Sequence, residues 1–426
     1  MRKIFLLPLL LLGVTISYSK VAEPNFVPKE KIVNEKLLEI CNDEKEPTIE
    51  TLKNIVNIES FSSDHEGLVE LSNYLAEQLK KLGGNVEQLK PANNANGLNV
   101  VGKFKGTGTK NILLMAHMDT VYPKGSLKEA PWKQEGDKVF GPGVADAKSG
   151  VATILHTISV LNKMHFKNYK TLTVLFNTDE EIGSHGSREL ITNESNASNL
   201  ILSYEPTLAG QEFLILNTSG TGKVKVTVNG LSAHAGAAPE EGINALVEAA
   251  NFVEKTVSLD EGAGGTRFNW TVFESGNTEN LNVIPDTATI YADIRFLTED
   301  KLKEALNILN EKAKETKIKN SEIIVEYLDG NRPPFNTNEK GMKLLQNATD
   351  IYHSLGEKLH ILPSTGGGTD AGYTMESGNP AMEGMALAGN NAHVLGQEFV
   401  DTTSIPRRLY LSAHTIIDAC DTNIID

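Results

Sequence analysis

The chain has 426 residues, of which 40% are hydrophobic and 22% are charged, and its formal net charge at pH 7 is −15. This is the composition of an ordinary globular protein that is long enough for two domains. The acidic balance, without a basic stripe, argues against nucleic acid or an anionic membrane surface as a partner. We therefore expect a single acidic enzyme in solution.

The N-terminus has the pattern of a secretory signal peptide over residues 1–19. A basic start is followed by an apolar stretch over 4–16 and by Ser17-Tyr18-Ser19, a small-x-small cleavage site. The apolar stretch is shorter than the ~20 residues that a membrane-spanning helix needs, so an uncleaved anchor is the weaker interpretation. We expect export to the periplasm or the medium, with cleavage before Lys20.

The chain contains two cysteines, Cys41 and Cys420, one near each end of the expected mature protein. In an oxidising compartment they either pair or remain as two buried free thiols, and their spacing leaves both alternatives open.

The next segments predict a layered α/β domain. Leucines recur at intervals of three and four over residues 65–82, which predicts a helix with one buried face that ends at Gly83-Gly84. Short β-rich runs then alternate with helix-like segments such as 147–161, the pattern of a three-layer α/β domain. The β-rich runs are 98–104, 111–115, 171–176 and 200–204.

A different pattern begins near residue 219. Residues 224–228, 268–273 and 287–296 alternate in polarity, and 242–257 and 299–316 are helix-like. This pattern predicts a small inserted α+β module whose polar faces suit solvent or a partner subunit. From about residue 328 the chain returns to the first domain, with helices expected over 344–352 and 405–420. The predicted organisation is a signal peptide (1–19), a first catalytic part (20–218), the insertion (219–327) and a second catalytic part (328–426).

Candidate metal ligands lie where short apolar runs end. Because open α/β sheets place their sites at the carboxyl ends of strands, we expect these side chains to meet. Imidazoles and carboxylates without thiolates suit zinc, with manganese or cobalt as substitutes. There are more carboxylates than one zinc needs, which indicates two ions about 3.5–4 Å apart, bridged by one carboxylate. The candidates are His117 with the nearby Asp119, then Asp146, the pair Glu180-Glu181, Glu205 and His393.

The side chains of Glu180 and Glu181 diverge because the two residues are adjacent, so one is expected to bind metal while the other faces the cavity. A carboxylate beside a metal-activated water takes its proton and later delivers it to a leaving amine. In isolation, a solvated acidic turn is the alternative interpretation.

Further candidates concern the substrate. His234, among small residues, is placed to polarise a scissile carbonyl, with a structural role as the alternative. Arg295 and Arg332 each suit a substrate carboxylate, although a surface role is the default for an arginine. A glycine-rich stretch either opens backbone N–H groups toward an anion or is a plain flexible loop; it includes Gly367, Gly368 and Thr369. We assign no role to the remaining histidines, His185 among them.

The ordered motifs are His117-x-Asp119, Gly143-Val144-Ala145-Asp146, Asp179-Glu180-Glu181-Ile182-Gly183-Ser184, Tyr204-Glu205-Pro206-Thr207, His234-Ala235-Gly236, Ala292-Asp293-Ile294-Arg295, Arg332-Pro333 and Gly366-Gly367-Gly368-Thr369-Asp370. Together they resemble the M20 family of co-catalytic zinc metallopeptidases, most closely its glutamate carboxypeptidase (carboxypeptidase G) branch. The match extends from about Leu98 to Arg408. It departs from the family pattern at His185, where proline is common, and in a longer turn over 276–285.

The resemblance implies a three-layer zinc-exopeptidase-like catalytic domain with an inserted, ferredoxin-like dimerisation domain, and two Zn²⁺ per subunit. Asp146 would bridge the ions. His117 and Glu205 would complete one site, and Glu181 and His393 the other.

The same resemblance implies catalytic roles for three residues. Glu180 would be the general base, and Asp119 would orient the ring of His117. His234 would reach the active site of the other subunit and stabilise the oxyanion, so that a homodimer formed through the insertion takes part in catalysis.

Arg332 and Asn282 match positions that hold the α-carboxylate of a C-terminal residue in this branch, with Arg295 as a further candidate. The implied activity is that of an exported dizinc exopeptidase that releases a C-terminal amino acid, expected to be glutamate, from peptidyl or N-acyl substrates. The alternatives are an N-acyl amino acid deacylase or a dipeptidase of the same family. An alternative from another class is an exported peptide-binding protein without turnover, which would need a broken metal site.

Overall fold

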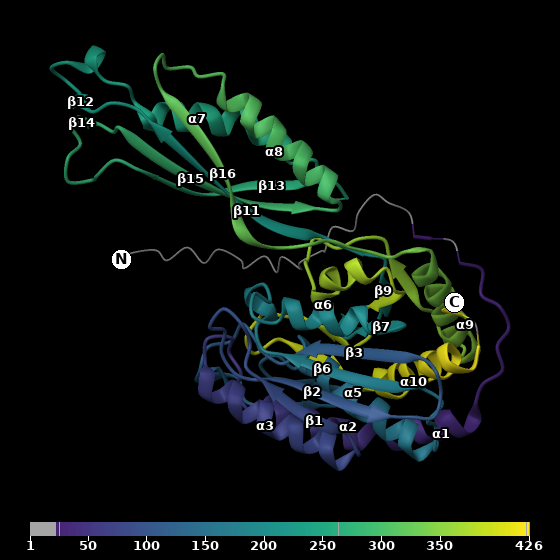
Figure 1. Ribbon diagram of the computed structural model, residues 1–426. Coiled ribbons are helices and arrows are strands. Elements are labelled where there is room, and N and C mark those ends of the chain that lie inside the picture. The colour runs from purple at the N-terminus through teal and green to yellow at the C-terminus, as the bar shows by residue number, and fades with distance from the viewer. Residues whose placement is uncertain (1–22, 25, 263, 423, 426) are drawn as a thin grey trace, which may run out of the picture.

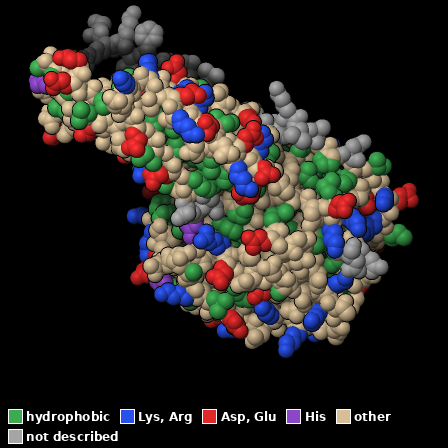
Figure 2. Space-filling view, turned by 45° about the horizontal axis from the view of Figure 1, so that its top comes forward, with side chains coloured by type: hydrophobic (Ala, Val, Ile, Leu, Met, Phe, Trp, Pro, Cys, Tyr) green, Lys and Arg blue, Asp and Glu red, His purple; other side chains and the backbone are tan. Residues whose placement is uncertain are grey.

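The computed structural model describes residues 23–24, 26–262, 264–422 and 424–425, so the predicted signal peptide lies outside the described residues. Figure 1 shows two units: a layered first domain, and an insertion that projects from it as an arm. On the face seen in Figure 2, acidic and basic side chains are mixed over both units, in agreement with the expected lack of a basic stripe. Within the described ranges, no helix is long and apolar enough to cross a membrane.

An eight-stranded mixed sheet forms the centre of the first domain, in the order β1-β2-β6-β3-β7-β19-β9-β18. Strand β3 runs parallel to both β6 and β7, so the carboxyl ends of these three strands meet at one edge of the sheet. The bounds are β1 (Asn85–Leu89), β2 (Asn99–Lys105), β3 (Asn111–His117), β6 (Thr171–Asn177), β7 (Leu200–Ser203), β9 (Phe213–Ile215), β18 (His360–Leu362) and β19 (Ala381–Glu383).

Helices cover both faces of this sheet. Along β3, Ile112 and Leu114 contribute to the larger core, whereas Leu113 and Met115 face a smaller core on the opposite side, as the two-residue repeat of a strand requires. The larger core includes α1 (Glu35–Asp43), α2 (Lys45–Val56), α3 (His65–Lys81), α5 (Lys148–Lys163), α9 (Glu339–Ser354) and α10 (Ile405–Asp421). The smaller core includes α6 (Arg188–Asn196) and the 3₁₀ segment η4 (Asp370–Ser377). This confirms the predicted three-layer α/β domain (Figure 1).

The first domain contains a second sheet, whose strands come from segments far apart in the chain. Its order is β4-β5-β21-β20-β8. The strands are β4 (Lys133–Glu135), β5 (Lys138–Phe140), β8 (Thr207–Leu208), β20 (Ala388–Asn390) and β21 (Phe399–Asp401). The short elements of this domain are α4 (Ser126–Glu129), η1 (Glu180–Ile182) and η5 (Thr402–Ser404). The loop after β20 carries His393 to the carboxyl end of the main sheet.

The insertion is a four-stranded antiparallel sheet in the order β13-β15-β11-β16, with two helices packed on one face. Alternate residues of β11, namely Val224, Val226 and Val228, pack against Phe252 and Leu309 of the helices. The bounds are β11 (Gly220–Asn229), β13 (Arg267–Ser275), β15 (Thr287–Phe296), β16 (Glu322–Arg332), α7 (Ala245–Thr256) and α8 (Glu299–Ala313). The insertion is thus the predicted α+β module.

Shorter elements complete the insertion. A two-stranded ladder of β12 (Ala233–His234) and β14 (Val283–Ile284) forms its tip, and β10 (Asn217–Thr218) pairs with β17 (Phe335–Asn336) where the two units join. Two 3₁₀ turns, η2 (Pro239–Glu241) and η3 (Val257–Leu259), flank α7.

The boundary expected at residue 328 falls inside β16, because this strand pairs with β11 as far as Arg332, and the Asp329-Gly330-Asn331 sequence carries no alternation that predicts a strand. Cys41 and Cys420 are free thiols rather than a disulfide, but only Cys41 is buried; Cys420 is partly exposed, so the expected pair of buried thiols holds for one of the two.

Candidate metal centre

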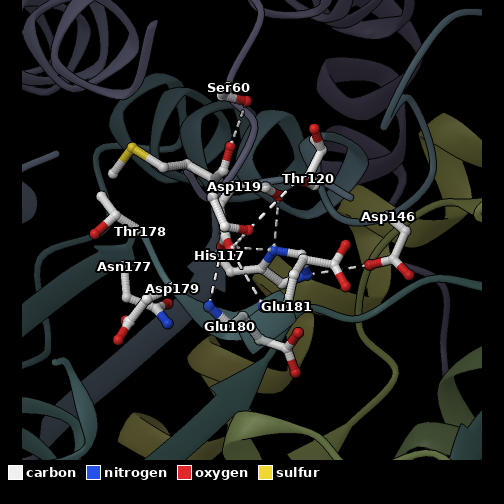
Figure 3. A network of polar contacts seen from close by, with 12 residues as sticks. Ser60, His117, Asp119, Thr120, Asp146, Asn177, Thr178, Asp179, Glu180 and Glu181 are labelled. Atoms are coloured by element: carbon white, nitrogen blue, oxygen red, sulfur yellow. Dashed lines mark hydrogen bonds and ion pairs between the residues drawn. The ribbon is translucent and has the colours of Figure 1, made fainter. Parts of the chain in front are cut away.

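His117, the last residue of β3, presents one ring nitrogen to an acidic cluster. Its Nδ1 lies 3.0 Å from the backbone oxygen of Asp119 and 3.3 Å from Asp119 Oδ1, both of which accept hydrogen bonds. Nδ1 therefore carries the hydrogen, and Nε2 faces Asp146, 3.0 Å from its Oδ1. Figure 3 shows the His117 ring between Asp119 and Asp146. This arrangement fixes the tautomer that leaves Nε2 as the ligand atom.

The two carboxylate oxygens of Asp146 face different histidines. Oδ1 lies 3.0 Å from His117 Nε2, and Oδ2 lies 3.2 Å from His393 Nε2. A further carboxylate accompanies each histidine: Glu205 Oε1 is 3.7 Å from His117 Nε2, and Glu181 Oε1 is 3.5 Å from His393 Nε2. The geometry is that of two half-sites that share one carboxylate.

The donor set fits a divalent metal. Ligand atoms of His117, Asp146 and Glu181 all lie within 4.8 Å of one another. Glu181 Oε1 is buried, and among the described residues its only polar neighbour is the His393 ring nitrogen 3.5 Å away; a buried acceptor so weakly satisfied destabilises a protein unless a cation or a closer donor reaches it. Imidazole nitrogens and carboxylate oxygens are the ligands typical of zinc enzymes.

Burial and crowding of acidic groups shift the pKa values here. Burial raises the pKa of Glu181 to about 7 and raises the pKa of Glu205, although the nearby His117 lowers it in part. Burial also raises the pKa of Asp146, but its contacts with the rings of His117 and His393 outweigh burial and lower the net value. Hydrogen bonds to Asp146 and Glu181 raise the pKa of His393 to about 10. Such a crowded acidic pocket favours a bound cation.

Asp119 connects two of the elements that carry these groups. Its Oδ1 accepts the backbone N–H of Glu180 at 3.0 Å, and its Oδ2 accepts the N–H of Glu181 at 3.2 Å and the hydroxyl of Ser62 at 2.7 Å. The fully buried Asp119 carboxylate therefore orients His117 and also holds the turn at η1 against the end of β3 (Figure 3).

Residues 113–418 match the model of peptidase family M20/M25/M40. The chain belongs to this family. It is 46% identical over 382 residues to carboxypeptidase G2 from Pseudomonas sp. (strain RS-16), a match that covers 90% of this chain and 91% of that protein. This M20 peptidase is therefore a metal-dependent hydrolase of the metallo-exopeptidase, carboxypeptidase type, as its motifs predict.

Solved structures of other proteins share the fold of this chain. The aminopeptidase PepT from Bacillus cereus ATCC 10987 has a TM-score of 0.73 at 22% identity, over 89% of this chain and 99% of that one. The M20 family metallo-carboxypeptidase Sso-CP2 from Sulfolobus solfataricus has a TM-score of 0.67 at 18% identity, over 87% and 98% of the two chains. At these identities the likeness concerns the fold alone.

The M20 peptidase has a cavity of about 610 Å³ at the metal centre. Most of the residues expected from the sequence line it: Asp146, Glu180, Glu181, Glu205, Arg295, Arg332, Gly367, Gly368, Thr369 and His393. An apolar wall of Leu208, Phe213, Ile215 and Leu362 lies in the same cavity, and Lys223 contributes a further cation. The cavity thus combines an acidic metal side, a basic wall and an apolar wall.

The two arginines differ in their surroundings. Arg332 is buried, with Nη1 2.7 Å from Glu180 Oε1 and 2.6 Å from the backbone oxygen of Gly368. Arg295 is partly exposed and pairs with both oxygens of Asp293, at 2.8 and 3.0 Å. Burial raises the pKa of Glu180, although the positive charge of Arg332 lowers it in part.

His234 and Asn282 lie together at the tip of the insertion, and neither is among the residues described as lining the cavity (Figure 1). Nδ1 of the exposed His234 accepts backbone N–H groups from Gly236 at 3.1 Å and Ala237 at 3.0 Å. Its Nε2 therefore carries the hydrogen. The backbone oxygen of Asn282 accepts the N–H of Ala235 at 2.8 Å. Within one chain, the fold separates these two residues from the metal centre.

Sequence reasoning missed several polar residues of this region, including Lys223 of the cavity. His185, to which we assigned no role, lines the cavity; burial, Arg188, Lys223 and Arg332 lower its pKa. Glu383 and Glu398 are buried carboxylates; Glu383 interacts electrostatically with Glu205, and Glu398 accepts the backbone N–H of Asp146. For Glu383, a signal was available, because it is an isolated charge in the apolar run Ala381-Met382-Glu383-Gly384-Met385.

Proposed function

We propose that this M20 peptidase is a dizinc carboxypeptidase that releases a C-terminal glutamate from peptidyl or N-acyl substrates. The observation that carries the proposal is the division of the Asp146 carboxylate between His117 and His393, with Glu180 and Arg332 in the same cavity. Its 46% identity to a carboxypeptidase G2 over nearly the whole chain supports the carboxypeptidase G type of specificity.

In this proposal, Asp146 would contribute to both zinc ions. His117 and Glu205 would complete one site, and Glu181 and His393 would complete the other. Bound zinc polarises a carbonyl oxygen and lowers the pKa of water toward ~7. Cobalt and manganese suit the same nitrogen and oxygen ligands.

Glu180 is the proton carrier. It lines the cavity without belonging to either pair of histidine and carboxylate at Asp146. Its carboxylate takes a proton from the water that attacks the scissile carbonyl carbon and then gives it to the leaving amide nitrogen.

The basic wall selects the C-terminal residue. The planar guanidinium of Arg332 suits the α-carboxylate, and Gly367, Gly368 and Thr369 line the space beside it. Arg295 and Lys223 on the same wall supply positive charge for a second carboxylate, which favours glutamate. The apolar wall then accommodates the acyl or peptidyl part of the substrate.

The second subunit of a homodimer supplies His234 and Asn282. The His234 Nε2–H is exposed and its tautomer is fixed, as a donor to an oxyanion in another chain requires. β13 is an edge strand of the insertion and exposes Val272 and Phe273, an apolar edge of the kind that natural proteins usually cover. These features support dimerisation through the insertion, residues 219–327.

We also propose that the protein is exported. The signal-peptide pattern of residues 1–19 predicts a mature chain that begins at Lys20. N-terminal sequencing of the protein recovered from the periplasm or the medium tests this prediction.

The decisive experiment measures free amino acid released from a panel of C-terminal glutamyl compounds, including a folate-type N-acyl glutamate, with alanyl and aspartyl compounds beside them. We expect glutamate release with zinc, its loss with chelator, and its return when zinc is added back. Turnover of other dipeptides or N-acyl amino acids without glutamate release would favour the dipeptidase or deacylase alternative. No turnover of any compound by the zinc-loaded protein would favour the peptide-binding alternative.

A further inference from the structure

Glu398 is a buried carboxylate that accepts four hydrogen bonds. Its Oε1 accepts the backbone N–H groups of Ala145 at 2.8 Å and Asp146 at 3.0 Å. Its Oε2 accepts the N–H of Gly143 at 3.2 Å and the hydroxyl of Tyr122 at 2.5 Å. With a relative exposure of 1%, Glu398 is shielded from solvent, so these donors replace its hydration.

Burial raises the pKa of Glu398, and hydrogen bonds from Tyr122 and from the backbone N–H groups of Ala145 and Asp146 offset this effect in part. The turn that it holds leads directly into α5, whose N-terminus carries the positive end of the helix dipole. Lys148, the first residue of α5, is buried and is electrostatically coupled to Glu398, while its Nζ donates to the backbone oxygen of Ile58 at 2.7 Å. A buried charge is retained only where donors and a countercharge offset the cost of desolvation.

Three of the four hydrogen bonds fix the backbone of the turn at 143–146. Glu398 holds the N–H groups of Ala145 and Asp146. Because these two peptide groups lead to the Asp146 side chain, their fixed orientation sets the direction of that side chain. This direction decides whether the two carboxylate oxygens reach His117 and His393 at 3.0 and 3.2 Å. Glu398 thus acts on the shared carboxylate through the backbone, without touching the histidines.

Glu398 also belongs to the segment that carries His393. The N–H groups of Gln397 and Glu398 both donate to the backbone oxygen of Val394, at 3.0 and 3.1 Å, so a compact turn joins His393 to Glu398. The next residue, Phe399, pairs with Phe140 of β5, just before the turn at 143–146. One segment therefore delivers His393 and holds the turn that delivers Asp146.

We propose that Glu398 is a positioning residue that couples the His393 segment to the Asp146 turn and thereby sets the metal affinity of the centre. The proposal rests on the metal-ligand assignment made above. Removing such an outer partner of a metal ligand typically lowers metal affinity by about 10–100-fold.

The test compares zinc affinity in the full mature protein, measured by competition with a chromophoric chelator. Glu398→Gln keeps the size of the side chain but turns an amide N–H₂ toward backbone donors, and we expect its zinc affinity to fall by about 10–100-fold. The matched control is Glu212→Gln. Glu212 is also buried and accepts a tyrosine hydroxyl, that of Tyr352 at 2.6 Å, and it pairs with Arg407 rather than with the 143–146 turn. This control is expected to lose stability and to keep its zinc affinity.

Two further measurements separate positioning from general destabilisation. The visible absorption of the Co²⁺-loaded protein reports ligand geometry and should change in Glu398→Gln but not in Glu212→Gln. Tyr122→Phe keeps the three backbone contacts of Glu398 and should retain zinc affinity near that of the parent. If Glu398→Gln does not fold, Glu398→Asp is judged by the same criteria, because its shorter carboxylate keeps the charge but cannot reach all four donors.

An unchanged zinc affinity and cobalt spectrum in the Glu398 variant, or a loss no larger than that of Glu212→Gln, would overturn the proposal. His393→Ala distinguishes this failure from a failure of the ligand assignment. If His393→Ala lowers zinc stoichiometry while Glu398→Gln has no effect, only the positioning role is wrong. If neither has an effect, the assignment of His393 as a ligand is wrong as well.

Discussion

Arg332 holds Glu180 at two points: Nη1 lies 2.7 Å from the Glu180 Oε1, and Nη2 donates to the Glu180 backbone oxygen. In the proposed mechanism, Glu180 is the base and Arg332 binds the substrate carboxylate, so each neutralises the other while the cavity is free of substrate. A substrate carboxylate that pairs with Arg332 releases the Glu180 side chain from its partner. Binding of the correct C-terminus and activation of the base are thus linked.

Arg332→Lys should lower kcat/KM for C-terminal acids by at least about 30-fold, since loss of a buried hydrogen bond between charged groups costs about 2–5 kcal/mol. The preference for a C-terminal acid over its carboxamide should fall in parallel, because lysine lacks the bidentate fork. Steady-state kinetics on the acid and amide pair measure both effects. Arg295→Lys is the control, with a smaller effect expected because Arg295 is partly exposed and already pairs with Asp293. Unchanged acid preference in Arg332→Lys would contradict this role.

Glu180→Gln should lower kcat by about 10²–10⁴-fold, the usual contribution of a general base. Zinc content should stay at the parental level because Glu180 is not a proposed ligand. Glu181→Gln is the neighbouring control and should lose zinc together with activity. Metal analysis and initial rates on the same preparations check both statements. A Glu180→Gln variant as active as the parent would remove the proposed base.

His234→Ala should be inactive on its own, and the loss should be complemented across subunits. When His234→Ala and Glu180→Gln proteins are mixed under conditions that exchange subunits, a hybrid dimer contains one site with an intact Glu180 from one chain and an intact His234 from the other. We expect the mixture to regain part of the parental activity. Two inactive proteins that stay inactive after verified exchange would place His234 in the site of its own chain.

Glu44 should make stability depend on pH in the acidic range. Burial alone would raise its pKa, but hydrogen bonds from His156, Lys163 and Ser159 outweigh burial and lower the pKa from 4.5 to about 2. The folded state therefore binds this proton more weakly than the unfolded state. The stability that Glu44 contributes is present above pH 4.5 and is lost as pH falls toward 2.

Glu44→Gln tests this contribution. At neutral pH it should lower the free energy of unfolding by about 2 kcal/mol, because it breaks buried hydrogen bonds to charged groups. The difference from the parent should shrink as pH falls below 4.5. Urea unfolding of the zinc-free proteins over a pH series measures it. A difference that stays constant down to the lowest pH would show that the charge of Glu44 makes no contribution.

Much of the metal centre was predictable because its ligands follow local signals. The apolar run before His117 predicts a buried strand, and parallel strands bring their carboxyl ends to one edge of a sheet. His117, Glu180 and Glu205 therefore meet because each lies at or just after the carboxyl end of a parallel strand, a position that the local sequence predicts. The repeat of three and four that predicts α3 and the alternation of β11 are equally local. Helix α3 therefore matches its expected range of 65–82 to within one residue, and β11 contains the expected residues 224–228 but extends over Gly220–Asn229.

The other features of the site depend on contacts between segments far apart in the chain. The sequence around Glu398 is the same whether this glutamate is solvated or buried, so its role emerges only when the surrounding elements pack. Arg332 pairs with Glu180 because β16 joins the insertion to the first domain. His234 lies away from the metal centre of its own chain because the arm projects from that domain. Local patterns therefore specify the layered domain, its insertion and the types of metal-binding residue, because periodicity and strand ends are local properties of the chain. Which charges face one another is set by the fold, because burial and charge pairing depend on the packing of the whole chain.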